Sequence, residues 1–186
     1  MTDAWADGET IRRIVQRMAA AVVDETLASG AAGVEELALV GIRRGGVPLA
    51  EALAKAIGEI AEPVPVGTVD ISLYRDDAAT ALPDPKIGPS VIPFRVAGRD
   101  VVLVDDVLQT GRTIRAAIDC LLDYGRPRRV WLAVLFDRGG RELPIAPDFV
   151  GRVVEVAPGA RLEVLLDADG QLSEAQLSDP ETGESA

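Results

Sequence analysis

Two buried strands joined by a loop and a helix constrain the fold of this chain more than any other feature. Residues 100–106 (DVVLVDD) form an apolar run that ends in two aspartates, and residues 129–136 (RVWLAVLF) form a second apolar run. Between them, residues 107–113 (VLQTGRT) are typical of a loop, and residues 114–124 space their apolar side chains like a helix. Strand, helix and strand within about 40 residues form a βαβ unit. Nearly continuous apolar strands predict a parallel sheet with helices on both faces.

The segments before this unit fit the same α/β class. Apolar residues recur at helical spacing in residues 8–29, and residues 37–42 form a short apolar run that predicts a strand. Pro48 suits the first turn of a helix that continues to Ile57, and β-branched alternation predicts another strand over residues 64–74. We therefore expect one mostly parallel central sheet flanked by helices.

Two segments do not fit this regular pattern. Residues 75–99 are rich in Pro, Gly and Asp and lack helical spacing, which predicts a flexible loop with a hairpin over residues 90–96. Residues 178–186 are acidic and contain Ser and Gly, which predicts a disordered tail. The length of the chain suits one hydrophobic core, so we expect residues 1–177 to form a single domain.

The composition excludes several kinds of site. No histidine is present, which rules out Ser-His-Asp and Cys-His catalysis and histidine-ligated zinc. The single cysteine, Cys120, excludes an internal disulfide. Its position beside Leu121 and Leu122 favours a buried structural thiol over a nucleophile.

Charge and hydropathy restrict the partners and the location. The formal net charge is −11, which disfavours non-specific nucleic-acid binding but is compatible with a local basic patch. Much of this charge lies in residues 162–186, which contain no Lys or Arg. No apolar run reaches the ~18 residues that span a bilayer, and residues 1–10 are acidic and lack an apolar signal core. We therefore expect a cytoplasmic protein with no membrane partner.

The loop and helix start after the first strand of the βαβ unit carry the chemistry of the predicted site. The first N–H groups of a helix have no partner within the helix and favour an anion. Gly111 lets the backbone approach that anion, and the hydroxyls of Thr110 and Thr113 add donors. No Gly-Lys-Ser/Thr is present, so this is not a Walker loop. The predicted phosphate loop comprises Val107, Leu108, Gln109, Thr110, Gly111, Arg112 and Thr113.

A pair of carboxylates, Asp105 and Asp106, immediately precedes this loop. The spacing suits a sugar phosphate whose 5-phosphate lies in the loop while the carboxylates accept hydrogen bonds from the ribose hydroxyls. An acidic pair there would also stabilise positive charge that develops at the anomeric carbon. The string is also compatible with another nucleotide-binding or phosphate-handling α/β protein, because an Asp-Asp pair alone is a weak signal.

Taken together, these segments resemble the pyrimidine operon regulator (PyrR) family of type I phosphoribosyltransferases. The resemblance extends over residues 11–151 and is most specific in residues 70–77 (DISLYRDD) and 141–145 (RELPI). It also includes residues 39–42, 105–113, 124–127 and 137–140. It implies the type I phosphoribosyltransferase fold. It also implies transfer of the phosphoribosyl group of 5-phosphoribosyl-1-pyrophosphate (PRPP) to uracil, which forms UMP and pyrophosphate.

The resemblance also assigns residues to parts of this reaction. The implied catalytic residues are Asp105, Asp106 and Arg75. The implied pyrophosphate site comprises Arg43, Arg44, Gly45, Gly46, Tyr74 and Arg75, the last two from a flexible loop that closes over it. Many members have an arginine at the position of Gly45, and Arg44 is the expected source of that charge. The residues implied to lie beside uracil are Phe136, Asp137 and Arg138. The implied cofactor is Mg²⁺, held mostly by substrate oxygens and water, with no ligand set fixed by the protein alone.

A second activity implied by the resemblance is UMP-dependent binding to the leader of pyrimidine operon (pyr) mRNA, which attenuates transcription. The candidate RNA contacts are Arg12, Arg13, Arg17, Arg138 and Arg141. The first three are also compatible with a solvated helix face. Two alternatives stay open: a salvage enzyme that has lost RNA binding, and a purine-specific phosphoribosyltransferase. Because family members form dimers or larger assemblies, a homo-oligomer is also expected.

Overall fold

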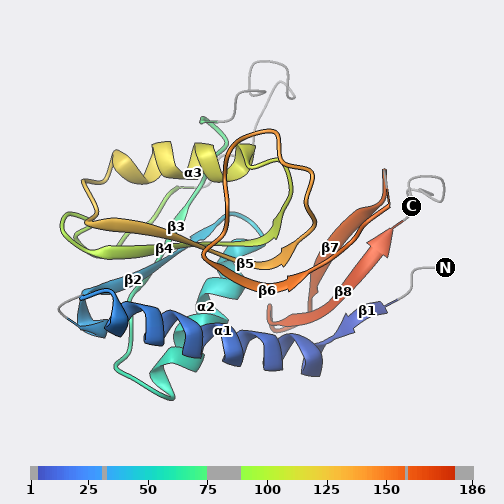
Figure 1. The fold of residues 1–186 in the computed structure, drawn as a ribbon, viewed down its shortest axis with the longest axis horizontal. Coiled ribbons are helices and arrows are strands. Elements are labelled where there is room, and N and C mark those ends of the chain that lie inside the picture. Colours follow the sequence, from blue (N-terminus) through green and yellow to red (C-terminus); the bar gives the residue numbers. More distant parts are fainter. Residues whose placement is uncertain (1–3, 31–32, 75–88, 158, 179–186) are drawn as a thin grey trace.

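The main sheet of the protein is parallel throughout. The computed structural model describes residues 4–30, 33–74, 89–157 and 159–178 (Figure 1). Five strands pair in the order β3-β2-β4-β5-β6, and every pair is parallel. They are β3 (Val66–Val69), β2 (Leu37–Ile42), β4 (Asp100–Leu108), β5 (Arg129–Asp137) and β6 (Phe149–Val153). The predicted α/β class is confirmed.

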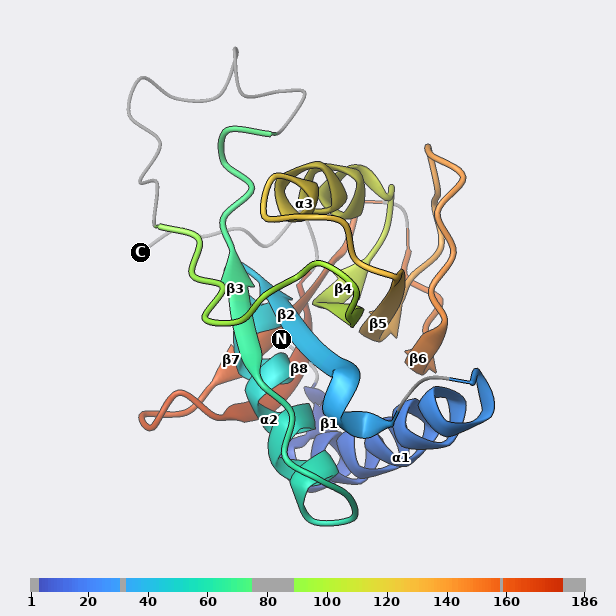
Figure 2. The same ribbon diagram turned by 90° about the vertical axis from the view of Figure 1, so that its left-hand side faces the viewer.

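Helices cover both faces of this sheet, as predicted. Helices α1 (Gly8–Ala28) and α2 (Gly46–Gly58) lie on one face and α3 (Arg112–Leu122) lies on the other, and a short 3₁₀ turn, η1 (Val34–Glu36), precedes β2 (Figures 1 and 2). Alternate side chains of β4 explain the two layers. Val102 and Val104 pack in the core under α1 and α2, while Val101 and Leu103 pack in the core under α3. None of the helices within the described residues is long and apolar enough to cross a membrane.

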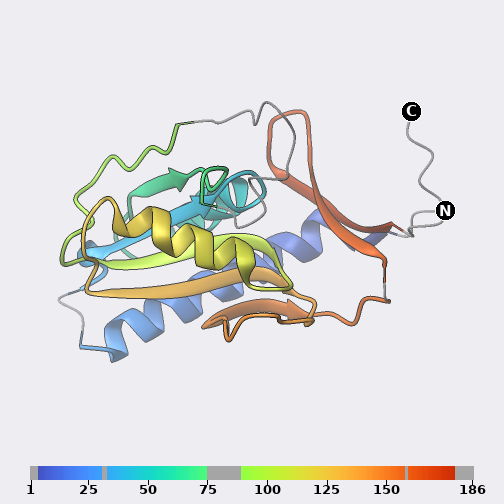
Figure 3. The same ribbon diagram turned by 90° about the horizontal axis from the view of Figure 1, so that it is seen from above.

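A second, smaller sheet stands beyond the carboxyl ends of the parallel strands (Figures 1 and 3). It contains β1 (Ala4–Asp7), β8 (Leu172–Ser178) and β7 (Arg161–Leu166), all antiparallel. The Asp7 side chain accepts a 2.9 Å hydrogen bond from the Thr10 backbone N–H, so β1 ends where α1 begins. We call this the small sheet; the sequence patterns did not predict it.

Three predicted boundaries are wrong. The strand expected over residues 64–74 ends at Val69, because Asp70 turns the chain by accepting hydrogen bonds from the backbone N–H and hydroxyl of Ser72. The predicted hairpin at residues 90–96 is absent from the described residues 89–99, where Val91 instead forms one antiparallel bridge with Thr68. Ser178 belongs to β8 rather than to a tail. The remaining tail, residues 179–186, lies outside the described residues.

Candidate active site

Two adjoining cavities lie at the carboxyl ends of the parallel strands, where ligands bind in sheets of this kind. The first has a volume of about 330 Å³ and the second about 390 Å³. Asp105, Val107 and Thr113 line both. The end of β4 therefore separates two compartments of one site.

The first cavity is formed by the predicted phosphate loop and the small sheet. The irregular part of this loop is shorter than predicted, because Val107 and Leu108 extend β4 and α3 already starts at Arg112. The opposite wall comes from residues beyond β5 and from β7, namely Arg138, Arg161, Leu162 and Glu163. The last three were not predicted as site residues. We call this the phosphate cavity.

Gly111 shapes the turn into α3. Its φ of +89° is in the left-handed region that favours glycine, and a Cβ there would lie 3.0 Å from Cγ1 of Ile145. The Thr110 hydroxyl accepts a hydrogen bond of 3.3 Å from the Arg112 backbone N–H. The first turn of α3 follows directly, with its N–H groups facing the cavity end of the helix. This geometry is compatible with a phosphate, and the phosphate loop stays a prediction.

Backbone hydrogen bonds tie the phosphate loop to the segment that follows β5, residues 137–145, which we call the bracing segment. The Thr110 carbonyl accepts from the N–H groups of Glu142 and Leu143, at 3.0 and 3.1 Å. The Leu108 carbonyl accepts from the Arg138 N–H at 3.1 Å. The loop is therefore held in place independently of any ligand.

Arg141 adds side-chain bonds to this brace. Its guanidinium donates to the carbonyls of Gln109 and Ile145, both at 3.0 Å, and pairs with Asp137 at 2.6 Å. Burial raises the pKa of Asp137, but its bonds with Arg141 and the Gly139 N–H outweigh this, and the net shift is downward. Arg141, which was predicted as an RNA contact, is thus engaged inside the site.

Asp105 and Asp106 stand at the boundary between the two cavities. Asp105 is only 6% exposed, and its carboxylate accepts a 3.1 Å bond from the Asp106 N–H, while Asp106 accepts one of 2.9 Å from the Val107 N–H. Burial, followed by the neighbouring Asp106 charge, raises the pKa of Asp105 well above its ordinary value. Burial also raises the pKa of Asp106. The pair is therefore poised to gain from a cation or a developing positive charge beside it.

The second cavity contains most of the predicted pyrophosphate loop. Arg43, Arg44 and Gly45 line it. A Cβ at Gly45 would lie 2.1 Å from Oδ2 of Asp106, so glycine permits the loop to approach this carboxylate. The peptide bond between Arg43 and Arg44 is cis. The remaining wall, which was not predicted, is formed by Asp70, Ile71 and Ser72. We call this the pyrophosphate cavity.

Tyr74 and Arg75, predicted to close over pyrophosphate, have different outcomes. Tyr74 is held toward α3, because its hydroxyl donates to Asp123 and its carbonyl accepts a 2.9 Å bond from Arg115. The bond with Asp123 raises the pKa of the Tyr74 hydroxyl to about 12. Arg75 lies outside the described residues, as does most of the predicted flexible loop.

Of the three residues predicted beside uracil, only Arg138 lines the phosphate cavity. Its guanidinium donates to the Ala160 carbonyl at 2.8 Å, at the start of β7. The Phe136 ring is fully buried and meets Trp5 edge-to-face at 5.3 Å between centroids. Asp137 is occupied by Arg141.

The five predicted RNA contacts divide into two groups. Arg12, Arg13 and Arg17 are exposed on α1, and Arg17 donates to the Gly151 carbonyl of β6. Arg138 and Arg141 instead make internal bonds beside the phosphate loop. α1 therefore offers the more accessible basic surface of the two.

The donor set of the site suits magnesium only in part. Within the described residues, no group of three or more His, Cys, Asp or Glu side chains could hold a metal ion. The two carboxylates at the cavity boundary are hard oxygen donors, which Mg²⁺ prefers, and substrate phosphates and water commonly complete its coordination. The residues therefore fit a Mg²⁺ ion that binds together with a phosphorylated substrate.

Sequence comparisons place the chain among known proteins. Residues 1–159 match the family described as phosphoribosyl transferase domain. The bifunctional protein PyrR of Roseiflexus sp. (strain RS-1) is 52% identical over 166 residues, which cover 88% of each chain. The bifunctional protein PyrR of Geobacter sp. (strain M21) is 48% identical, over 92% of this chain and 94% of the relative.

Solved structures confirm the fold. The hypoxanthine phosphoribosyltransferase of Trypanosoma cruzi superposes with a TM-score of 0.70 at 20% identity, over 96% of this chain and 97% of that chain. The hypoxanthine phosphoribosyltransferase of Staphylococcus aureus gives 0.62 at 19% identity, over 82% and 78%. At these identities, the likeness extends to the architecture alone.

Proposed function

Because this chain belongs to the PyrR family of phosphoribosyltransferases, we propose that it transfers the phosphoribosyl group of PRPP to uracil and forms UMP and pyrophosphate. The observation that carries the proposal is the pair of cavities that meet at Asp105, with Asp106 lining the second of them. PRPP has a phosphate at one end of its ribose and a pyrophosphate at the other. Two anion-binding compartments separated by a carboxylate pair match that shape.

The ends of PRPP fit the two compartments by charge. The phosphate cavity offers the first turn of α3 and the Thr110 and Thr113 hydroxyls to the 5-phosphate. The pyrophosphate cavity offers Arg43 and Arg44 to the leaving group. In this arrangement the ribose hydroxyls lie beside the carboxylate pair.

In the proposed reaction the bond between C1′ and the pyrophosphate oxygen breaks, and the oxygen keeps the electron pair. Positive charge then develops on the ribose, where Asp105 and Asp106 stabilise it electrostatically. N1 of uracil forms the new bond to C1′, and its proton passes to the departing pyrophosphate. Bound Mg²⁺ would offset the negative charge of the pyrophosphate. Arg75 is proposed to help hold the leaving group; it lies in the predicted lid, which would exclude water that hydrolyses PRPP.

Uracil is proposed to bind between the phosphate loop and the small sheet. Arg138, Arg161 and Glu163 supply hydrogen-bonding groups on this side of the phosphate cavity. The test is a turnover assay with uracil, hypoxanthine, guanine and adenine, each with PRPP and Mg²⁺. We expect UMP from uracil and no purine nucleotide. Turnover of a purine without turnover of uracil would instead favour the purine-specific alternative.

A second proposed function is UMP-dependent binding to the leader of pyr mRNA. Two observations favour it: relatives of about half identical sequence are named bifunctional, and α1 exposes three arginines, Arg12, Arg13 and Arg17. The test is titration with the leader RNA of its own operon, with and without UMP, at fixed salt. We expect UMP to tighten binding and Arg13→Gln to weaken it. If unrelated RNA binds as tightly as the leader RNA and both lose affinity at higher salt, the binding is non-specific and only the salvage function remains.

Self-association is proposed as part of this function, in the form of a dimer or a larger homo-oligomer. Sedimentation equilibrium over a range of protein concentrations tests it directly. A mass equal to that of one chain at every concentration would contradict it.

A further inference from the structure

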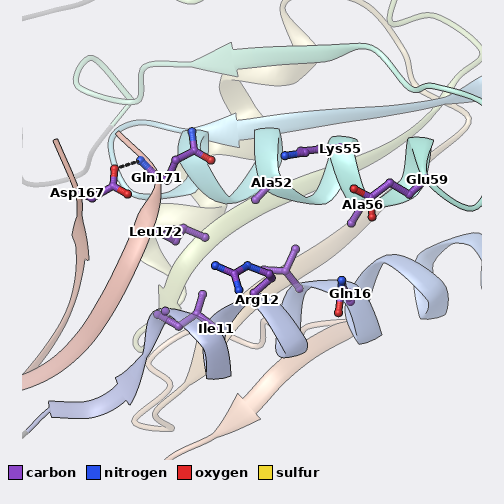
Figure 4. A pocket seen from close by; sticks show the side chains of 12 residues that line it. Ile11, Arg12, Gln16, Ala52, Lys55, Ala56, Glu59, Asp167, Gln171 and Leu172 are labelled. Atoms are coloured by element: carbon purple, nitrogen blue, oxygen red, sulfur yellow. Dashed lines mark hydrogen bonds between the residues drawn. The ribbon is translucent and has the colours of Figure 1, made fainter. Parts of the chain in front are cut away.

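A third cavity, of about 320 Å³, lies away from the carboxylate pair, between α1, α2 and the turn that joins β7 to β8 (Figure 4). Its floor is apolar and shallow because small side chains of α2, Ala52 and Ala56, face Ile11 and Val15 of α1. We call it the interhelical cavity. Its volume is at the lower end of the range for small-molecule sites, which begins at about 300 Å³.

Two cations in this cavity have no partner among the residues that the structure describes. Arg12 on α1 and Lys55 on α2 make no hydrogen bond or ion pair in the part of the chain that the structure describes. The two carboxylates of the cavity lie toward its opposite ends, with Arg12 and Lys55 between them (Figure 4). One of them, Asp167, already accepts bonds from the N–H groups of Asp169 and Gln171, both at 2.9 Å. The middle of the cavity is therefore basic and its ends accept hydrogen bonds.

This charge pattern is complementary to a ligand that has one anionic group and hydrogen-bond donors on either side of it. An anionic group would bind between Arg12 and Lys55, and hydroxyl or amino groups on either side would donate to Asp167 and Glu59. The apolar floor would contact the body of the ligand. We propose that the interhelical cavity binds a small organic phosphate, no larger than a mononucleotide, at a site separate from the active site.

The same hairpin connects this cavity to the active site. The turn residues Asp167 and Gln171 line the interhelical cavity, whereas Arg161 and Glu163, on β7 of that hairpin, line the phosphate cavity. A ligand that fixes the turn therefore also restricts the strand beside the base. The inferred consequence, which rests on the proposed function, is that occupancy of the interhelical cavity changes the KM for uracil.

Binding is tested by calorimetry with UMP, GMP and ribose 5-phosphate as separate probes. We expect at least one probe to bind at two sites per chain. In the double variant Arg12→Gln/Lys55→Gln the second site should weaken by about tenfold or more, because both charge-assisted bonds are lost. Arg13→Gln removes the same charge from α1 outside the cavity and is the matched control. One site per chain for all three probes, or a second site unchanged in the double variant, overturns the proposal.

Coupling is tested with ribose 5-phosphate as the effector at saturating PRPP, which occupies the phosphate loop. We expect the KM for uracil to shift in the wild type and in Arg13→Gln, and to stay constant in the double variant. A second site without any shift in KM would overturn the coupling. UMP formation in the absence of effector tests the proposed function separately, so either idea can fail without the other.

Discussion

The phosphate cavity and the pyrophosphate cavity share Asp105, Val107 and Thr113 but are built differently. The phosphate loop is fixed to the bracing segment by backbone bonds at Leu108 and Thr110 and by the Arg141 side chain. On the pyrophosphate side, Arg43 is exposed and its guanidinium reaches one carbonyl, that of Pro89, at 3.2 Å. The phosphate side of the site, which we call the braced half, is therefore held by hydrogen bonds, whereas the pyrophosphate side is open.

This difference matches the fate of the two ends of PRPP in the proposed reaction. The 5-phosphate is present in both PRPP and UMP, so the same preformed pocket can bind it before and after the reaction. Pyrophosphate must leave after each turnover, and a site with exposed arginines can release it with little rearrangement. The contrast indicates that preorganisation is concentrated where the ligand does not change.

The largest expected effect comes from breaking the braced half. In Gly111→Val the new side chain would meet Ile145 and require a left-handed backbone, so the loop must move away from the phosphate. We expect UMP affinity by calorimetry to fall by about a hundredfold or more, as expected for two lost charge-assisted bonds. Gly98→Val is the control, since Gly98 has a φ of +83° but no atom near its Cβ position. Normal UMP binding by Gly111→Val would contradict this placement of the loop.

Removing one charge at the boundary should have the next largest effect. Asp106→Asn keeps the size of the side chain and an oxygen that can accept from the Val107 N–H, but loses the negative charge. We expect kcat to fall by roughly a hundredfold, in the range for removal of one electrostatic partner of a transition state. Asp119→Asn, on the exposed surface of α3, is the control. Unchanged turnover would remove Asp106 from the site.

Loosening the brace, rather than breaking it, should affect binding more than chemistry. Arg141→Gln removes the ion pair with Asp137 and the bond to the Gln109 carbonyl. We expect the KM for PRPP to rise about tenfold with a smaller change in kcat, because the loop loses order but keeps its donors. Arg126→Gln changes an exposed arginine in the same way and should leave both constants unchanged. A fall in kcat without a rise in KM would argue against bracing.

The smallest effect should appear in stability and should depend on pH. Because the pKa of Asp105 is raised in the folded state, its ionisation destabilises the protein as pH rises above the ordinary value of 3.8. Asp105→Asn should therefore be more stable than the wild type at pH 8. The difference should shrink as pH falls toward 3.8, which urea denaturation at several pH values would detect. A constant difference would mean that Asp105 is not the titrating group.

The braced half was the more predictable from sequence. The strand, the two aspartates and the Thr-Gly turn are contiguous, so residues 105–113 contain their own structural signals. Of the residues predicted for pyrophosphate, Arg43, Arg44 and Gly45 line the pyrophosphate cavity, whereas Gly46 and Tyr74 do not. Its other wall, at Asp70 and Ser72, depends on a turn that interrupts a β-branched run and has no strong local signal.

The small sheet was missed for a different reason. β1 is four residues long, and no strand was predicted for residues 161–177, which were considered only for their charge. A usable signal was present, because Asp169-Gly170 is a favoured hairpin turn and Leu162 and Val164 alternate with polar residues. The wall residues Arg161 and Glu163 were missed as a result.

The pairing of β1 with β8 also bears on how the protein is made. Ala6 pairs with Ala175, so a strand near the start of the chain has no partner until almost all of the described chain has left the ribosome. The parallel sheet and the phosphate loop involve shorter separations and can form earlier. An unfinished chain would thus hold the phosphate loop without β7, the wall proposed to lie beside the base. Base selection would then be the last property that the nascent protein acquires.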